Sequence, residues 1–279
     1  MFVLQKNPAA LESAKAEQAV ILDARQRLAD ASAGLTFEPE QHRYFFFGRE
    51  MRSVSSIIEH FAPFDTLAAA QRAAKNPRHP LYGKSVEEIV ALWELKRDNA
   101  AAAGTSVHSF AEACCLFLHD MEDEMEPQWK ERISDAGLVA TEPKEKAVAR
   151  WWASIDWNRY AFVAKETRLV NPMLGYAGTF DLLLLDRYMR SFVMDDFKTN
   201  EDLYKWYGDY LRPPLSMLKA NDLEKYTVQQ TLYSIVVKAL GMPLCSNNLI
   251  WLRETGFEEV ALSMIYERVI QFAVSQLKQ

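Results

Sequence analysis

Cysteine is scarce in this chain of 279 residues, which holds only Cys114, Cys115 and Cys245. Three cysteines, two of them adjacent in an apolar helical run, cannot supply the disulfide framework of a small secreted protein. We therefore expect a reduced protein of the cytoplasm.

Glycine and proline are also few, at 10 and 11 residues, whereas 49% of the residues are hydrophobic and 25% are charged. This balance excludes collagen-like, low-complexity and broadly disordered chains. The longest aliphatic runs, such as residues 182–185, have the length of a strand, and no cationic leader precedes an apolar segment. Neither secretion nor a membrane span is expected.

An excess of positive charge is missing as well. The chain has 32 basic and 38 acidic residues, which gives a formal net charge of −6. No field over the whole surface attracts polyanions, so any contact with nucleic acid must be local.

Hydrophobic periodicity and capping residues predict a chain of mixed helices and strands. Helices are expected over residues 8–32, from Ser53, over 85–118 with a second helix starting near Gly104, over 144–156, over 223–240 and at the end of the chain. Strands are expected as a hairpin within 35–48 and over 160–170, 178–186, 192–197, 249–253 and 259–263. Residues 119–135 break the pattern as an acidic loop. No repeat and no long linker marks a domain boundary.

Three charged residues are expected to meet on the central strands. Alternation along a strand places Asp196 and Lys198 on one face, and Asp181 faces them if the two strands are neighbours. Carboxylates suit Mg²⁺ or Mn²⁺, and a nearby lysine can position or deprotonate a water for phosphodiester hydrolysis. Taken alone, an Asp-x-Lys pair is more often an ordinary solvent-facing ion pair.

Two helices carry further polar candidates. His108 and Glu112 share one helix face, so His108 could bind a metal while Glu112 fixes its tautomer by a hydrogen bond. Gln229 and Tyr233 also lie one turn apart and could hydrogen-bond a phosphate or a base. The alternative is that each of these pairs is structural, which is the commoner case for such residues taken singly.

The order of these motifs resembles the PD-(D/E)XK nuclease superfamily, specifically its RecB-type branch of phage, mitochondrial and CRISPR-adaptation nucleases. The resemblance covers residues 104–253 and rests on His108 in a G-x-x-x-H helix, Glu166 on the first strand, Gly178-x-x-Asp181, Asp196-x-Lys198 and the Gln229-x-x-x-Tyr233 helix.

The resemblance implies an αβββαβ core, in which a mixed central sheet is flanked by helices, over residues 101–279. Residues 1–100 are expected to add an N-terminal helix, hairpin and helical layer packed on that core. His108, Asp181, Asp196 and the Phe197 carbonyl would bind Mg²⁺ or Mn²⁺, and Lys198 would activate the water. Glu166 would support the site or a second metal, and Gln229 and Tyr233 would orient Lys198 or the strand being cut.

The sequence differs from the RecB-type branch in two respects, which limit the cofactors and the motor activity that we expect. The three cysteines lack the spacing of an iron–sulfur cluster, so no cluster is expected. No G-x-x-x-x-G-K-[ST] phosphate-binding loop is present, so the nuclease would act without its own motor or beside a separate helicase or single-strand annealing protein.

Two segments are candidates for DNA binding. Residues 71–84, interpreted as a loop because of Pro77 and Pro80, contain no acidic residue and four basic ones, Arg72, Lys75, Arg78 and Lys84. An insertion after Lys198 offers aromatic side chains for stacking unpaired bases, among them Trp206, Tyr207 and Tyr210. Each segment has a structural alternative, a solvated loop in the first case and packing onto the core in the second.

The function that these observations favour is a metal-dependent DNA nuclease, an exonuclease of phage or bacterial recombination or repair. Two alternatives stay open. One is a nuclease-fold protein with a vestigial site that binds or assembles on DNA, and the other is an endonuclease on the same fold. The intact His108, Asp181, Asp196 and Lys198 set favours an active enzyme over a vestigial one.

Overall fold

The computed structural model describes residues 8–120, 139–264 and 266–277. Its helices are α1 (Pro8–Ser32), α2 (Val54–Phe61), α3 (Thr66–Lys75), α4 (Val86–Asp120), α6 (Pro143–Ser154), α7 (Asp222–Ala239) and α8 (Glu267–Ser275), with a 3-10 turn at Pro39–Gln41. Its strands are β1 (Leu35–Glu38), β2 (Arg43–Phe46), β3 (Arg49–Ser53), β4 (Tyr160–Asn171), β5 (Tyr176–Asp186), β6 (Ser191–Lys198), β7 (Leu244–Arg253) and β8 (Gly256–Ala261).

The strands form one mixed sheet in the order β1-β2-β3-β5-β6-β7-β8, and β4 pairs with β5 outside this path. Most neighbours are antiparallel, whereas β3 with β5 and β6 with β7 are parallel. Helix α7 connects the parallel strands β6 and β7, as parallel neighbours require a long crossover. The predicted mixed α/β architecture, a central sheet flanked by helices, is confirmed.

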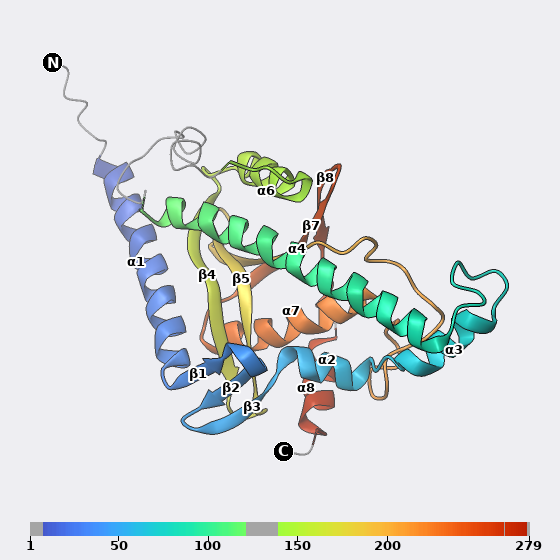
Figure 1. Cartoon of the computed structure of the whole chain (residues 1–279). Coiled ribbons are helices and arrows are strands. Elements are labelled where there is room, and N and C mark those ends of the chain that lie inside the picture. The colour runs from blue at the N-terminus through green and yellow to red at the C-terminus, as the bar shows by residue number, and fades with distance from the viewer. Residues whose placement is uncertain (1–7, 121–138, 265, 278–279) are drawn as a thin grey trace.

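Helices cover both faces of the sheet (Figure 1). One apolar core joins the sheet to α1, α2, α7 and α8, with Phe180, Leu183 and Met194 among its buried strand residues. The other joins it to α4 and α6, with Leu182 and Phe197 facing that side. Because strand side chains alternate, β5 and β6 are buried on both faces, which explains their nearly continuous apolar sequences.

Strand β5 meets different neighbours along the edge opposite β4. Its start pairs with β3 at Tyr176 and Ala177, and its end pairs with β6 from Leu182 to Asp186. Between these two ladders, residues 178–181 pair with no described strand on that edge. The gap places Gly178 beside helix α7 and Asp181 beside the end of β6.

Three sequence-based expectations require correction. Helix α4 is one continuous helix from Val86 to Asp120 and not two, because Gly104 costs only about 1 kcal/mol in a helix interior. The predicted hairpin has a third strand, β3. Arg72 and Lys75 lie on helix α3 and not in a loop, while Arg78 and Lys84 follow it. Most of the expected acidic loop at 119–135 falls outside the described residues.

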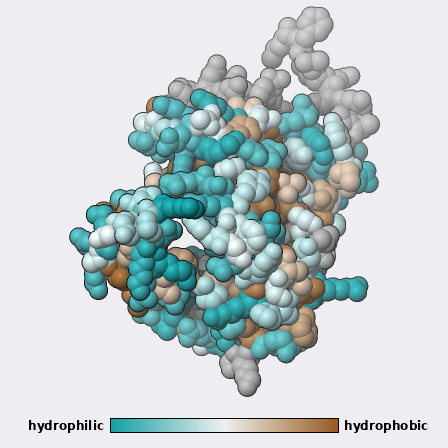
Figure 2. All heavy atoms as spheres, turned by 90° about the vertical axis from the view of Figure 1, so that its right-hand side faces the viewer, coloured by the Kyte–Doolittle hydropathy of each residue, from teal (hydrophilic) through white to brown (hydrophobic). Residues whose placement is uncertain are grey.

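Helix α3, the loop after it and the start of α4 project from the body at the right of Figure 1. Figure 2 faces this side, and the projecting part is predominantly hydrophilic in colour. Within the described parts of the chain, no helix combines the length and the apolar character needed to cross a bilayer.

Candidate metal centre

The candidate site forms where β5 and β6 separate. Their ladder stops at Leu182 and Asp195, while β6 continues to pair with β7 as far as Lys198. Asp181 lies at the point of separation, and its Oδ2 accepts a hydrogen bond from the Phe197 backbone N–H at 2.8 Å. The side chain therefore bridges the gap between the two strands.

Two further ligand candidates converge on Asp181. Helix α4 brings the His108 Nδ1 to 3.4 Å from Asp181 Oδ2. On β4, Glu166 lies between Lys165, which pairs with Leu182, and Thr167, which pairs with Phe180. One ligand atom from each of His108, Glu166 and Asp181 lies within 4.8 Å of the other two. A single cation can reach all three.

Asp196 and Lys198 form the buried part of the site. Asp196 is fully buried, and its carboxylate contacts the Lys198 ammonium. The Asp196 Oδ1 is also buried and has no hydrogen-bond partner in the described residues. A buried carboxylate oxygen without a partner is costly, so it marks a position where a ligand is expected.

Electrostatics also favour a cation here. Glu166 is exposed to the cleft, but partial desolvation by the surrounding protein, followed by the Asp181 carboxylate, raises its pKa to about 8. Burial and Asp181 likewise raise the pKa of Asp196 to about 6, against the opposing effect of Lys198. Burial lowers the pKa of Lys198, but the carboxylates of Asp196 and Asp181 outweigh it and raise the pKa above its usual range. The carboxylates carry more negative charge than Lys198 neutralises.

The polar pair on α7 makes the internal hydrogen bond expected if the pair is structural. Gln229 Nε2 donates to the Tyr233 hydroxyl at 3.3 Å, and Tyr233 is buried against Gly178. The residue beside Lys198 is Tyr226, whose ring centroid lies 4.6 Å from the ammonium nitrogen and whose hydroxyl donates to Asn200. Sequence reasoning missed Tyr226, because the contact with Lys198 arises from how α7 packs on the sheet.

Glu112 has a different partner from the one predicted. Its Oε1 pairs with Lys165 Nζ at 3.0 Å, and Lys165 is the residue just before Glu166. The His108 Nδ1 lies near Asp181 instead. Glu112 thus ties α4 to β4 next to the candidate ligands.

A cleft of about 450 Å³ opens above these groups. Helix α4 forms one wall with Ala100, Ala101 and Gly104, and the end of β6 forms the other with Lys198, Thr199 and Asn200. The side chains of His108 and Glu166 line the cleft between these walls. Of the candidate ligands, His108 and Glu166 are therefore accessible from outside.

The two predicted DNA-binding segments are both at the surface. Arg72, Lys75, Arg78 and Lys84 are exposed. Trp206, Tyr207 and Tyr210 are exposed as well, and Trp206 contacts Tyr210 edge to face. The Lys219 ammonium lies 5.1 Å from the Trp206 ring centroid.

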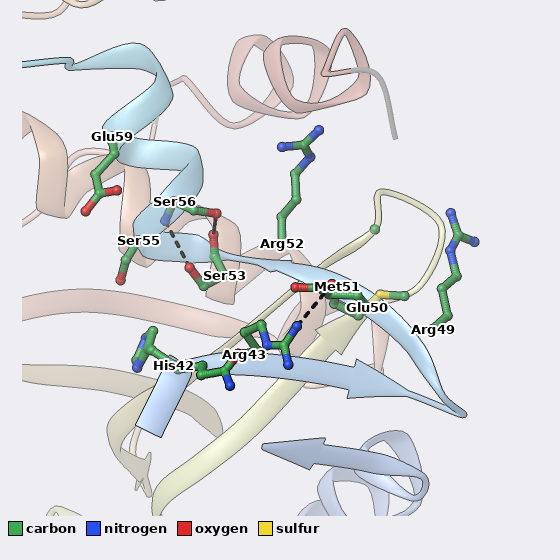
Figure 3. Close-up of a pocket in the computed structure, with 12 residues that line it drawn as sticks. His42, Arg43, Arg49, Glu50, Met51, Arg52, Ser53, Ser55, Ser56 and Glu59 are labelled. Atoms are coloured by element: carbon green, nitrogen blue, oxygen red, sulfur yellow. Dashed lines mark hydrogen bonds and ion pairs between the residues drawn. The ribbon is translucent and has the colours of Figure 1, made fainter. Parts of the chain in front are cut away.

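A second pocket, of about 820 Å³, lies between β2, β3 and the start of α2. Its lining includes Arg43, Arg49 and Arg52, and Figure 3 shows the latter two side chains extending from β3 while Arg43 reaches Glu50. Glu50 and Glu59 also line it. This pocket shares no residue with the group of metal-ligand candidates.

No protein-family profile matches the chain, and no curated protein matches its sequence. Among solved structures, it is similar to a crystal structure described as "Putative exonuclease" from Eubacterium rectale. The TM-score is 0.42 and the sequence identity 14%, over 81% of this chain and 78% of that one.

Proposed function

We propose that this protein is a metal-dependent nuclease that hydrolyses phosphodiester bonds in DNA, with the PD-(D/E)XK arrangement of the RecB-type branch. The observation that carries the proposal is the convergence of His108, Glu166 and Asp181 within reach of one cation, beside the buried Asp196–Lys198 pair. An exonuclease role in phage or bacterial recombination or repair follows from the motif resemblance.

The donor set suits Mg²⁺ or Mn²⁺. Carboxylate oxygens bind hard divalent cations, and an imidazole nitrogen favours Mn²⁺ over Mg²⁺. His108, Asp181 and Asp196, with Glu166 at the edge, would hold the ion, and the partnerless Asp196 Oδ1 supports this fit. When bound, such an ion supplies charge neutralisation at the scissile phosphate and lowers the pKa of a coordinated water.

The chain's own residues would position the reacting groups. Lys198, fixed between Asp196 and the Tyr226 ring, would place its ammonium next to the attacking water and the phosphate. Asp181 fixes the Phe197 backbone by accepting its N–H, which orients the Phe197 carbonyl predicted to join the ligand set. Thr199 and Asn200 line the path by which the strand reaches Lys198.

The test is cleavage of end-labelled linear single- and double-stranded DNA with Mg²⁺, with Mn²⁺ and with EDTA. Cleavage is expected with either ion, and none with EDTA or with the Asp196→Ala or Lys198→Ala variant. The matched control is Glu254→Gln, an exposed acidic residue in the β7–β8 turn, which should cleave like the parent. Full activity of Asp196→Ala contradicts the site assignment, and calorimetry without any divalent-ion binding supports a vestigial site.

A further inference from the structure

Within the described part of the chain, the middle of helix α4 buries no side chain. Every residue from 94 to 103 is exposed, including the four alanines at 100–103. A helix in a folded protein normally buries an apolar stripe along its length. Before this stretch, Ile89 of α4 packs against helix α3. After it, Val107 and Phe110 of α4 pack against the sheet. Helix α4 therefore spans a gap between two packed ends.

The projecting part of the molecule, residues 62–93, is called the arm here. The insertion after β6, residues 199–221, contacts the residues that flank the arm on both sides. The Lys96 ammonium pairs with Glu201 at 3.1 Å, and the Arg212 backbone N–H donates to the Phe61 carbonyl at 2.7 Å. Two segments thus form a closed ring. One runs from Phe61 through the arm to Lys96, the other from Glu201 to Arg212, and the two contacts join them at both ends.

This ring encloses open space and borders the cleft. Figure 2, which faces the arm, shows an opening between the arm and the body. Ala100 lies one turn beyond Lys96, and Asn200 immediately precedes Glu201, and both residues line the cleft of the candidate metal centre. A strand that passes through the ring would therefore arrive beside Lys198.

The two sides of the ring differ chemically. The arm carries Arg72, Lys75, Arg78 and Lys84 and no acidic residue between 66 and 86, and in the described structure none of the four forms an ion pair. The insertion carries exposed aromatic rings, Trp206, Tyr207 and Tyr210 among them. Exposed cations on one segment and exposed aromatic rings on the other match a polymer with a charged backbone and free planar bases, which is single-stranded nucleic acid.

We propose that this ring encircles one strand of single-stranded nucleic acid, with the Lys96–Glu201 pair as its clasp. Both partners of that pair are exposed, at 68% and 79% of their side-chain area, and an exposed ion pair contributes little to stability. The clasp therefore opens readily, and a strand enters from its end or through the open clasp. This inference names single-stranded nucleic acid as the substrate of the proposed nuclease. Only the cleavage of the bound strand, and not its binding, rests on that proposed function.

The test locks the clasp. Lys96→Cys and Glu201→Cys are joined by a short bis-maleimide in a protein that also carries Asp196→Ala, to prevent cleavage, and Cys245→Ser, to remove an exposed thiol. The ligands are one DNA oligonucleotide in linear form and the same oligonucleotide ligated into a circle. The locked ring is expected to bind the linear strand roughly tenfold or more tightly than the circle, since exclusion forfeits stacked bases at about 1 to 3 kcal/mol each.

Trapping gives a second measurement that does not depend on affinity. When the clasp is locked after the circle has bound, the circle should survive a high-salt wash, whereas the linear strand should be washed away. The same protein treated with a monofunctional maleimide should bind both forms and retain neither. Equal binding of the two forms by the locked ring, or release of the pre-bound circle, overturns the proposal. Neither result depends on cleavage, so a protein that traps circles but cuts no DNA would refute only the nuclease function.

Discussion

Glu166 combines an unusual backbone with an unfavourable charge. Its φ of 41° lies in the left-handed region, which a non-glycine residue in a strand rarely adopts. The surrounding pairs of β4 with β5 hold it there, opposite Asp181. Strain of this kind costs about 1 to 3 kcal/mol and persists where the rest of the fold imposes it. In the proposed metal site, the fold would thus hold this carboxylate in place for a cation at the expense of stability.

The first prediction is that Glu166→Gln stabilises the metal-free protein, and increasingly so as the pH rises. The folded-state pKa of Glu166, about 8, lies above its ordinary value of 4.5. The carboxyl therefore supports folding fully only below about pH 4.5, and this contribution disappears as the pH rises through about 8. Urea unfolding in EDTA across this range measures the difference, and a difference that does not change with pH would contradict the assignment.

Gly178 is the position on β5 where a side chain does not fit. A Cβ atom there would lie 2.7 Å from Tyr233 Cε1 and 3.1 Å from Val54 Cγ2. We predict that Gly178→Ala destabilises the protein by about 1 to 3 kcal/mol, the usual cost of overpacking. Gly104→Ala is the control, because a Cβ at that helical position meets only Thr199 Oγ1 at 3.4 Å and should stabilise by about 1 kcal/mol. Equal effects in urea unfolding would refute the close approach of Tyr233.

At the scale of the elements, the exposed stretch of α4 should open more readily than its neighbours. Local opening requires little energy where few apolar contacts are broken. We predict that amides of residues 98–103 exchange hydrogen faster than those of residues 228–236 in α7, nearly all of which are buried. Amide exchange resolved by residue tests this, and equal protection of the two helices would show that α4 has a packing partner on that stretch.

The elements differ in how far the sequence predicts them. Strands β4, β5 and β6 follow from their apolar runs, and the meeting of Asp181 with Asp196 follows once these strands are neighbours. Strand β3 does not, because its sequence Arg49-Glu-Met-Arg-Ser53 is mostly charged and polar and is extended only through pairing with β2 and β5. The position of Tyr226 beside Lys198 depends on how α7 packs on the sheet, which no local pattern encodes. The exposure of residues 94–103 of α4 cannot be predicted from the sequence for the same reason, since an alanine is compatible with both an exposed and a buried helix face.

At the scale of the whole molecule, a net charge of −6 coexists with a locally basic arm. Long-range attraction of a polyanion is weak in this case, so contacts with phosphates must form at short range and remain sensitive to salt. Aromatic stacking in the insertion depends little on salt. In the proposed ring, the two segments would therefore contribute to the binding of a strand by separable physics.

The last prediction separates these contributions by a salt series. In an Asp196→Ala background, Lys75→Ala with Arg78→Ala should flatten the dependence of log K on log salt by about 0.7 for each single-strand phosphate that the variant no longer neutralises. Trp206→Ala should weaken binding by about 1 to 3 kcal/mol per stacked base and leave the slope nearly unchanged. The measurement is the affinity for an end-labelled single strand across a series of salt concentrations. If both variants bind like their parent at every concentration, the arm and the insertion are structural and the strand reaches Lys198 by another route.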